Sequence, residues 1–112
     1  MRRIVLVDDH ALFRAGVRGE LGDAVEIVGE AGSVAEAVPL IRDADPEVVL
    51  LDVHLPDVSG LYLAHALSGD AAVVLTSSRD ASDFADRLSG SGACGFVPKA
   101  ELSGDALDAL LP

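Results

Sequence analysis

The residues Val48-Val49-Leu50-Leu51-Asp52 are the most informative part of this chain for its fold, because four apolar residues run without a break into a carboxylate. A short run that is apolar at every position, rather than at alternate positions, is typical of a strand buried on both faces. Such strands belong to parallel sheets, because the crossovers that join parallel strands lay helices over both faces. The stretch therefore predicts a central strand with an acidic residue at its carboxyl end.

Four other short apolar stretches resemble this one, and helical patterns separate them. The predicted strands are residues 4–7, 25–28, 48–51, 72–75 and 95–97, and the predicted helices are residues 12–21, 33 to about 44, 60–68, 82–89 and 103–111. The second helix opens with the capping box Ser33-Val34-Ala35-Glu36 and ends before Asp45-Pro46. Five strands alternating with five helices predict an α/β domain with a doubly wound, five-stranded parallel sheet.

Proline and glycine residues lead to further predictions about local structure. Pro39 falls inside the second predicted helix, where it removes a backbone donor at a cost of about 3 kcal/mol, so we expect a kink or an early break there. Gly29 and Gly32 are expected to turn the chain out of the second strand.

Length and composition limit the class of protein. Half of the 112 residues are apolar, and 19 acidic against 8 basic side chains give a net charge of -11. A chain of this size forms one core, so we expect a single domain over residues 1–112 and no second domain in this chain. With no basic run, direct contact with nucleic acid is not expected. No segment approaches the roughly 20 apolar residues of a membrane span, and the lone Cys94 has no disulfide partner, so we expect a cytoplasmic location without a membrane partner.

Polar residues follow the predicted strands. They are Asp8 and Asp9 after the first strand, Asp52 after the third, Thr76, Ser77 and Ser78 after the fourth, and Lys99, behind Pro98, after the fifth. Lys99 and Thr76 are the only lysine and threonine in the chain. Doubly wound sheets bind ligands beyond the carboxyl ends of their strands, so these residues predict one site.

The residue types at this edge indicate phosphoryl chemistry. Crowded carboxylates repel one another, and an all-oxygen site suits Mg²⁺. The ion and the Lys99 ammonium would neutralise phosphoryl oxygens, and the Thr76 hydroxyl would donate a hydrogen bond. Asp52, central among the strand ends, is the best nucleophile. Each residue alone would more often be a helix cap or a solvated loop residue, so the prediction depends on the joint pattern.

Three segments together resemble the receiver domain of two-component response regulators, and the likeness covers essentially the whole chain. They are Val7-Asp8-Asp9-His10, the run VVLLDVHLP at 48–56 followed by Gly60, and GACGFVPK at 92–99. The first resembles receivers that are usually fused to a helix-turn-helix DNA-binding output. The resemblance implies a flavodoxin-like (βα)5 fold with strand order 2-1-3-4-5, and a signalling domain with slow phosphotransfer and autodephosphorylation rather than an enzyme.

The resemblance also implies roles for individual residues. Asp52 would accept the phosphoryl group from a sensor histidine kinase, and Mg²⁺ would be held by Asp9, Asp52, the backbone carbonyl of His54 and, through water, Asp8. Lys99 would pair with the acyl phosphate and Thr76 would hydrogen-bond to it. Phe96 would be the aromatic switch residue, Ser77 would leave the phosphoryl path open, and His54 and Ser78 would tune the phosphate lifetime. A plain core role for Phe96 and idle loop roles for His54 and Ser78 stay open.

Phosphorylation would then change the face formed by the fourth helix, the fifth strand and the fifth helix. This change would control the output of the regulator, which we expect to be transcription. The resemblance allows a homodimer on phosphorylation, but the fifth helix is short, and Pro98 precedes Lys99 where many receivers place a proline after it. The sequence does not decide between a stand-alone receiver and a piece of a longer regulator, although the abrupt end at Leu110-Leu111-Pro112 favours a piece.

Two other functions stay open. A small phosphohydrolase that forms an aspartyl phosphate would need a second acid two residues after the nucleophile, where this chain has His54. A pseudo-receiver that is never phosphorylated is disfavoured by the intact acidic set. The G-x-G-x-x-G match at 90–95 enters a strand instead of a helix, unlike a dinucleotide fingerprint. The histidines His10, His54 and His65 lack metal-binding spacing, so none of their side chains is expected in a metal site.

Overall fold

The computed structural model describes residues 2–57, 59–67, 70–78 and 90–111. Its strands are β1 (Arg2–Val7), β2 (Val25–Ala31), β3 (Val48–Asp52), β4 (Ala72–Ser77) and β5 (Gly95–Pro98), which form one parallel sheet in the order β2-β1-β3-β4-β5. The helices are α1 (Ala11–Leu21), α2 (Val34–Ala44), α3 (Gly60–Leu67) and α5 (Gly104–Leu110), with 3-10 turns η1 (Gly22–Ala24) and η3 (Lys99–Glu101). The predicted fold and strand order are confirmed, while the helix predicted over 82–89 lies outside the described residues.

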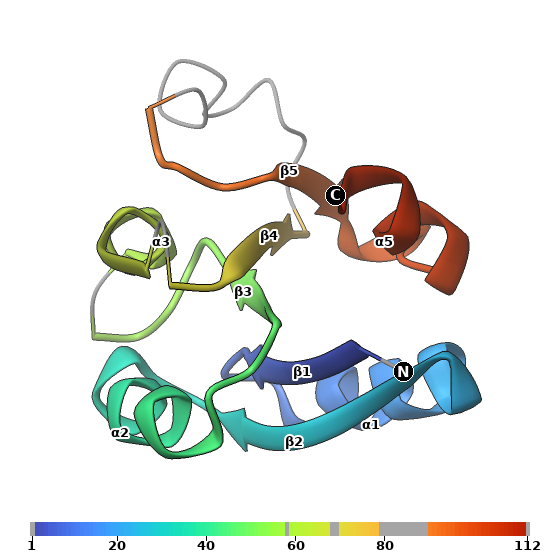
Figure 1. Ribbon diagram of the computed structural model, residues 1–112, viewed down its shortest axis with the longest axis horizontal. Helices are drawn as coiled ribbons and strands as arrows, with labels where there is room; N and C mark the ends of the chain where they lie inside the picture. Colours follow the sequence, from blue (N-terminus) through green and yellow to red (C-terminus); the bar gives the residue numbers. More distant parts are fainter. Residues whose placement is uncertain (1, 58, 68–69, 79–89, 112) are drawn as a thin grey trace.

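Helices cover both faces of the sheet. Figure 1 shows α2 and α3 on one side and α1 and α5 on the other. Each face carries its own apolar core, and successive residues of a strand enter different cores: Leu51 packs on the α2–α3 side and Leu50 on the α1–α5 side. All five residues of β3 are buried. This two-sided burial explains the unbroken apolar runs, since each buried Val or Leu side chain contributes about 1.5–3 kcal/mol.

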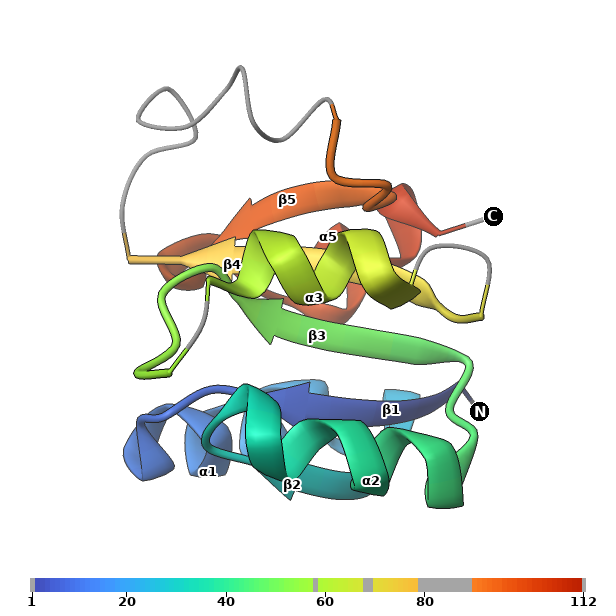
Figure 2. The same cartoon turned by 90° about the vertical axis from the view of Figure 1, so that its left-hand side faces the viewer.

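The carboxyl ends of the strands meet at one edge of the domain. All the strand arrows in Figure 2 point towards the same side, and the two ends of the chain lie at the opposite side. Asp52 of β3 is the register partner of Thr76 in β4, which is in turn the partner of Val97 in β5. The strand-end residues are therefore level with one another.

Pro39 does not end helix α2. The expected early break is wrong, because the helix continues to Ala44 and the chain leaves it at Asp45, whose φ is 46°. Pro39 is exposed, whereas Ala37 and Ile41 are buried in the core. The apolar face therefore holds the helix together across the missing donor. At the other end the predicted capping box forms, because Ser33 Oγ accepts from Glu36 N and Glu36 Oε1 accepts from Gly32 N.

Strand β2 is longer than predicted and continues through Gly29 to Ala31, so the turn expected at Gly29 is wrong. The pairing of β1 with β2 shifts register between Ile4 and Val5, opposite this part of β2. A Cβ atom on Gly29 would lie 2.8 Å from a side-chain methyl carbon of Leu40. Glycine at this irregularity thus lets helix α2 approach the sheet closely.

Among the described residues, none of the helices combines the length and hydropathy that a membrane crossing requires.

Candidate functional site

Two carboxylates are buried at the carboxyl edge of the sheet. Asp8 directly follows β1 and Asp52 is the last residue of β3, and they are 2% and 3% exposed. Each accepts a backbone N–H from the residue two positions further along: His10 N donates to Asp8 Oδ1 at 2.8 Å, and His54 N donates to Asp52 Oδ1 at 3.0 Å. These hydrogen bonds fix the orientation of both carboxylates, while Asp9 lies on the exposed rim.

The single lysine lies between the two buried carboxylates. Lys99 Nζ is 2.7 Å from Asp8 Oδ2 and 3.3 Å from Asp52 Oδ2, and it sits 4.5 Å from the centre of the Phe13 ring. Its contact with Asp8 is an ion pair outside hydrogen-bond geometry, whereas it donates a hydrogen bond to Asp52. Burial alone would lower the pKa of Lys99, but Asp8 and Asp52 outweigh it and raise the pKa, so the side chain carries its charge at neutral pH.

The surroundings of Asp52 disfavour its ionised form. Burial raises the pKa of Asp52, and the neighbouring charge of Asp8 raises it further, against the opposing effects of the His54 N–H and of Lys99. One ammonium therefore does not fully compensate the carboxylates around it, and a further cation would relieve the remaining repulsion.

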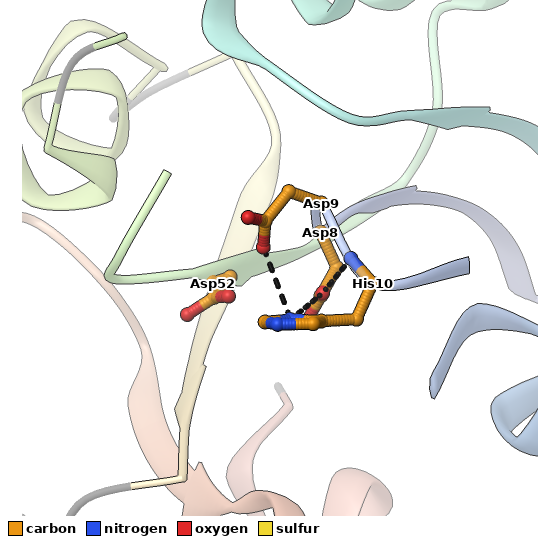
Figure 3. A group of neighbouring side chains, drawn as sticks. All are labelled: Asp8, Asp9, His10 and Asp52. Atoms are coloured by element: carbon orange, nitrogen blue, oxygen red, sulfur yellow. Dashed lines mark hydrogen bonds and ion pairs between the residues drawn. The ribbon is translucent and has the colours of Figure 1, made fainter. Parts of the chain in front are cut away.

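The donor atoms fit a divalent cation. Asp8, Asp9, His10 and Asp52 each offer a ligand atom, and these atoms all lie within 4.8 Å of one another (Figure 3). Oδ2 of Asp8 is buried, and its partner among the described residues is the Lys99 ammonium at 2.7 Å. Three carboxylates on rigid strand ends supply the hard oxygen ligands that Mg²⁺ prefers.

Hydroxyl groups of β4 complete this edge of the sheet. Thr76 and Ser77 are buried, and Ser78 after them is exposed. Val53 N donates to Thr76 O at 3.0 Å, which ties the chain after Asp52 to β4. Phe96 lies apart from the acidic cluster: it is half-buried in β5 and packs against the core on the α2–α3 side.

The loop after Asp52 is held by Gly60, which belongs to the motif quoted above, and by Asp57, to which the sequence pattern assigned no role. Gly60 N donates to Val53 O at 2.8 Å, and a Cβ atom on Gly60 would lie 2.0 Å from the carbonyl oxygen of Asp52. Asp57 accepts from Val34 N and Ala35 N, both at 3.0 Å, in the first turn of α2. These contacts fix the loop that carries His54, whose own side chain is exposed.

The His10 side chain lies beside the carboxylates, although no histidine spacing in the sequence indicated a metal site. Its Nδ1 lies 3.2 Å from Asp8 Oδ1 and 3.1 Å from Asp9 Oδ1. Sequence spacings typical of metal-binding histidines do not include His10, because its ring reaches Asp8 and Asp9 through a tight turn rather than along a helix. Its position directly after Asp8-Asp9 was the available signal.

Comparison with known proteins agrees with the fold. The family model for the response regulator receiver domain matches residues 4–111, and the chain belongs to this family. The nitrate/nitrite response regulator NarP of Escherichia coli (strain K12) is 38% identical over 102 residues, which cover 87% of this chain and 47% of NarP. The DNA-binding transcriptional activator DevR/DosR of Mycobacterium tuberculosis is 39% identical over 105 residues, or 88% of this chain and 48% of that protein.

A solved structure gives the same result. The crystal structure of a two-component response regulator of the LuxR family from Aurantimonas sp. SI85-9A1 matches with a TM-score of 0.85 and 32% identity, over 98% of this chain and 84% of that one. The chain spans about half the length of the curated relatives it matches. It is therefore the receiver domain of a two-component response regulator.

Proposed function

We propose that Asp52 is the phosphoacceptor and that a sensor histidine kinase supplies the phosphoryl group in a Mg²⁺-dependent step. The position of Lys99 is the main support for this proposal. Its ammonium touches Oδ2 of both Asp8 and Asp52, so it can neutralise an oxygen of a phosphoryl group on Asp52 without leaving its place. Asp8 and Asp9 remain beside it to hold a cation.

The reaction is an in-line displacement at phosphorus. An Asp52 carboxylate oxygen attacks, the new P–O bond forms, the P–N bond of the phosphohistidine breaks, and the electron pair stays on the imidazole nitrogen. Bound Mg²⁺ would neutralise charge on the transferring oxygens. Asp9, Asp52, the backbone carbonyl of His54 and, through water, Asp8 would hold this ion.

The neighbouring residues turn this chemistry into a switch. The Thr76 hydroxyl, level with Asp52 in the sheet, would turn to hydrogen-bond the phosphoryl group. Phe96 in β5, the strand beside β4, would follow that movement and alter the face of residues 82–89, β5 and α5. Ser77 is too small to block the phosphoryl group, and His54 and Ser78, exposed at the rim, would set how fast water removes it.

The output that we propose is control of transcription. NarP is named a response regulator and DevR/DosR a DNA-binding transcriptional activator, and both extend well beyond the region matched here. Residues 1–112 would act as the receiver domain of a cytoplasmic regulator whose helix-turn-helix segment binds DNA, without touching DNA themselves. The receiver would turn over its own phosphate slowly and could form a homodimer when phosphorylated.

The test is incubation with acetyl phosphate, with and without Mg²⁺, followed by intact mass spectrometry. Wild type should gain one phosphoryl group only with Mg²⁺, Asp52→Ala should gain none, and Asp70→Ala, an exposed acid elsewhere, should behave as wild type. No gain in wild type, or an equal gain in Asp52→Ala, refutes the proposal. Turnover of a generic phosphomonoester would point instead to a phosphohydrolase, and absence of Mg²⁺ binding to a pseudo-receiver.

A further inference from the structure

Arg14 in helix α1 connects the turn that presents the acidic residues to strand β2. Its Nη1 group donates a hydrogen bond to the backbone carbonyl oxygen of Asp8, and its Nε group donates to Oε1 of Glu30 at 2.9 Å. The side chain is 20% exposed, so both bonds are largely shielded from water. One guanidinium thus reaches two acceptors on separate segments, as its planar fork of donors permits.

Glu30 in β2 holds the guanidinium from the other side. Its two carboxylate oxygens accept from two arginines, Oε1 from Arg14 Nε and Oε2 from Arg18 Nε. Burial raises the pKa of Glu30, but the hydrogen bonds and charges of Arg18 and Arg14 outweigh it and lower the pKa, so Glu30 is ionised at neutral pH. Among the described residues, Arg18 bonds to Glu30 but not to Asp8. The two arginines therefore share one partner and differ in their contact with the acidic turn.

The backbone of Asp8 is held at both ends. Its N–H donates to Ala31 O at 2.9 Å, at the end of β2, and its carbonyl accepts from Arg14. That carbonyl belongs to the planar peptide group that joins Asp8 to Asp9, so its orientation sets the direction in which both side chains leave the chain. The main chain of Arg14 adds a further tie, because Arg14 N donates to His10 O at 3.1 Å.

We propose that Arg14 is a positioning residue for the Mg²⁺-dependent step, because it holds the peptide between Asp8 and Asp9 in the orientation that lets both carboxylates serve one cation. It acts through the backbone of these residues and need not touch the ion or the phosphoryl group. Ligands that are ordered before the ion arrives bind it more tightly, since ordering them costs free energy. The inference rests on the proposed function, which supplies the cation and the reaction.

The sign of the charge effect separates this role from simple electrostatics. A guanidinium near the acidic cluster repels a divalent cation, so removing its charge alone would strengthen Mg²⁺ binding. Loss of positioning would weaken it instead. Arg18 carries the same charge and pairs with the same carboxylate, which makes it a matched control for Arg14.

Glutamine is the substitution that isolates the contact with Asp8. The amide nitrogen of Gln lies as far along the side chain as Nε of Arg, so Arg14→Gln can still donate to Glu30 but falls two bonds short of the Asp8 carbonyl. We therefore expect Arg14→Gln to fold, as circular dichroism would confirm. Arg18→Gln makes the same chemical change without a bond to Asp8 at stake.

Amide hydrogen exchange in the metal-free chain, followed by NMR, tests the positioning directly. The informative amides are those of Asp8 and His10, which donate to Ala31 O and to Asp8 Oδ1. Arg14→Gln should speed their exchange by roughly fivefold, which corresponds to the loss of one hydrogen bond. Arg18→Gln should leave both amides unchanged.

Phosphoryl gain from acetyl phosphate over a series of Mg²⁺ concentrations tests the consequence. Arg14→Gln should raise the Mg²⁺ concentration that gives half the maximal rate by about tenfold, as loss of an outer contact to metal ligands does, with the rate at saturating Mg²⁺ close to that of wild type. Arg18 is half-exposed and its charge is screened, so Arg18→Gln should stay within about twofold of wild type.

Two results would overturn the inference and leave the proposed function intact. One is equal exchange and an equal Mg²⁺ requirement in Arg14→Gln and Arg18→Gln, and the other is a lower rate of Arg14→Gln at saturating Mg²⁺ with an unchanged half-maximal concentration. Absence of phosphoryl gain in wild type would refute the proposed function instead. The exchange measurement needs no metal, so it would still decide whether Arg14 holds the turn.

Discussion

Replacing Lys99 by Met removes the only side-chain cation within reach of the buried carboxylates among the described residues, and it keeps most of the apolar stem. Asp8 and Asp52 would then face each other with backbone N–H groups and, at Asp8, the His10 ring as their partners. Lys99→Met should therefore destabilise the fold as well as impair phosphorylation.

The size of the effect follows from the two contacts. At an effective dielectric constant of about 20, charges 2.7 and 3.3 Å apart attract by about 6 and about 5 kcal/mol, and the cost of burying the ammonium offsets much of this. Breaking a buried ion pair costs roughly 3–5 kcal/mol, and the Lys99 side chain is 15% exposed, so we expect about 3 kcal/mol. For 112 residues this lowers the Tm by roughly 12 °C.

Thermal unfolding followed by circular dichroism measures this loss. Added Mg²⁺ should restore part of it, and so should Asp52→Asn in the Lys99→Met background, because each removes the repulsion between the carboxylates. Burial and the charge of Asp8 raise the pKa of Asp52, so the folded state takes up a proton more readily than the unfolded chain. The deficit should therefore shrink as the pH falls from neutrality through that raised pKa. A Tm close to that of wild type, or a deficit that Asp52→Asn leaves intact, would contradict this role of Lys99.

Three further predictions concern the surroundings of the site. Gly60→Ala should lower the free energy of unfolding in urea by about 1–3 kcal/mol and slow phosphoryl gain, because the new Cβ atom meets the Asp52 carbonyl. Gly19→Ala, which has open space around it in α1, should raise the free energy of unfolding by about 0.5–1 kcal/mol. Equal effects of the two substitutions would contradict this prediction. Asp57→Ala should lower stability by about 1 kcal/mol through loss of two acceptors at the start of α2, and an unchanged urea midpoint would argue against that role. Since the pKa of Lys99 is raised, its stabilising ion pairs should persist up to the ordinary lysine pKa of about 10.4 and be lost as the pH rises through the higher pKa of the folded state. If the difference in stability between wild type and Lys99→Met disappears well below this pH range, the ion pairs of Lys99 are not its source.

Most of the sheet could be predicted because burial on both faces leaves a plain signal. The run at 48–51 needed no partner strand to be recognised, whereas the carboxyl ends of β2, β3, β4 and β5 were placed too early. Backbone pairing continues beyond the apolar residues to Asp52 in β3 and to Ser77 in β4, and apolar pattern carries no information on that extension. The early break expected at Pro39 was wrong for a related reason, since the buried contacts of α2 override a local preference.

The site could be predicted only in part. Parallel strands end at a common edge, so residues far apart in the sequence, such as Asp8, Asp52 and Lys99, could be placed together from topology alone. The ring of Phe13 under Lys99 comes from a helix face, and its distance from the ammonium depends on how α1 packs. His10 depends on a turn at the end of β1. Neither follows from strand order.

The order of the strands makes one part of the site more rigid than the other. β3, which ends in Asp52, is hydrogen-bonded to a neighbour on each side. In the described part of the chain, β5, which precedes Lys99, pairs with β4 alone and has four residues. Amide hydrogen exchange should therefore be slowest around the nucleophile and faster beside the ammonium. If phosphorylation of Asp52 rearranges the domain, we therefore expect β5 at the edge of the sheet to move more than β3, which carries Asp52.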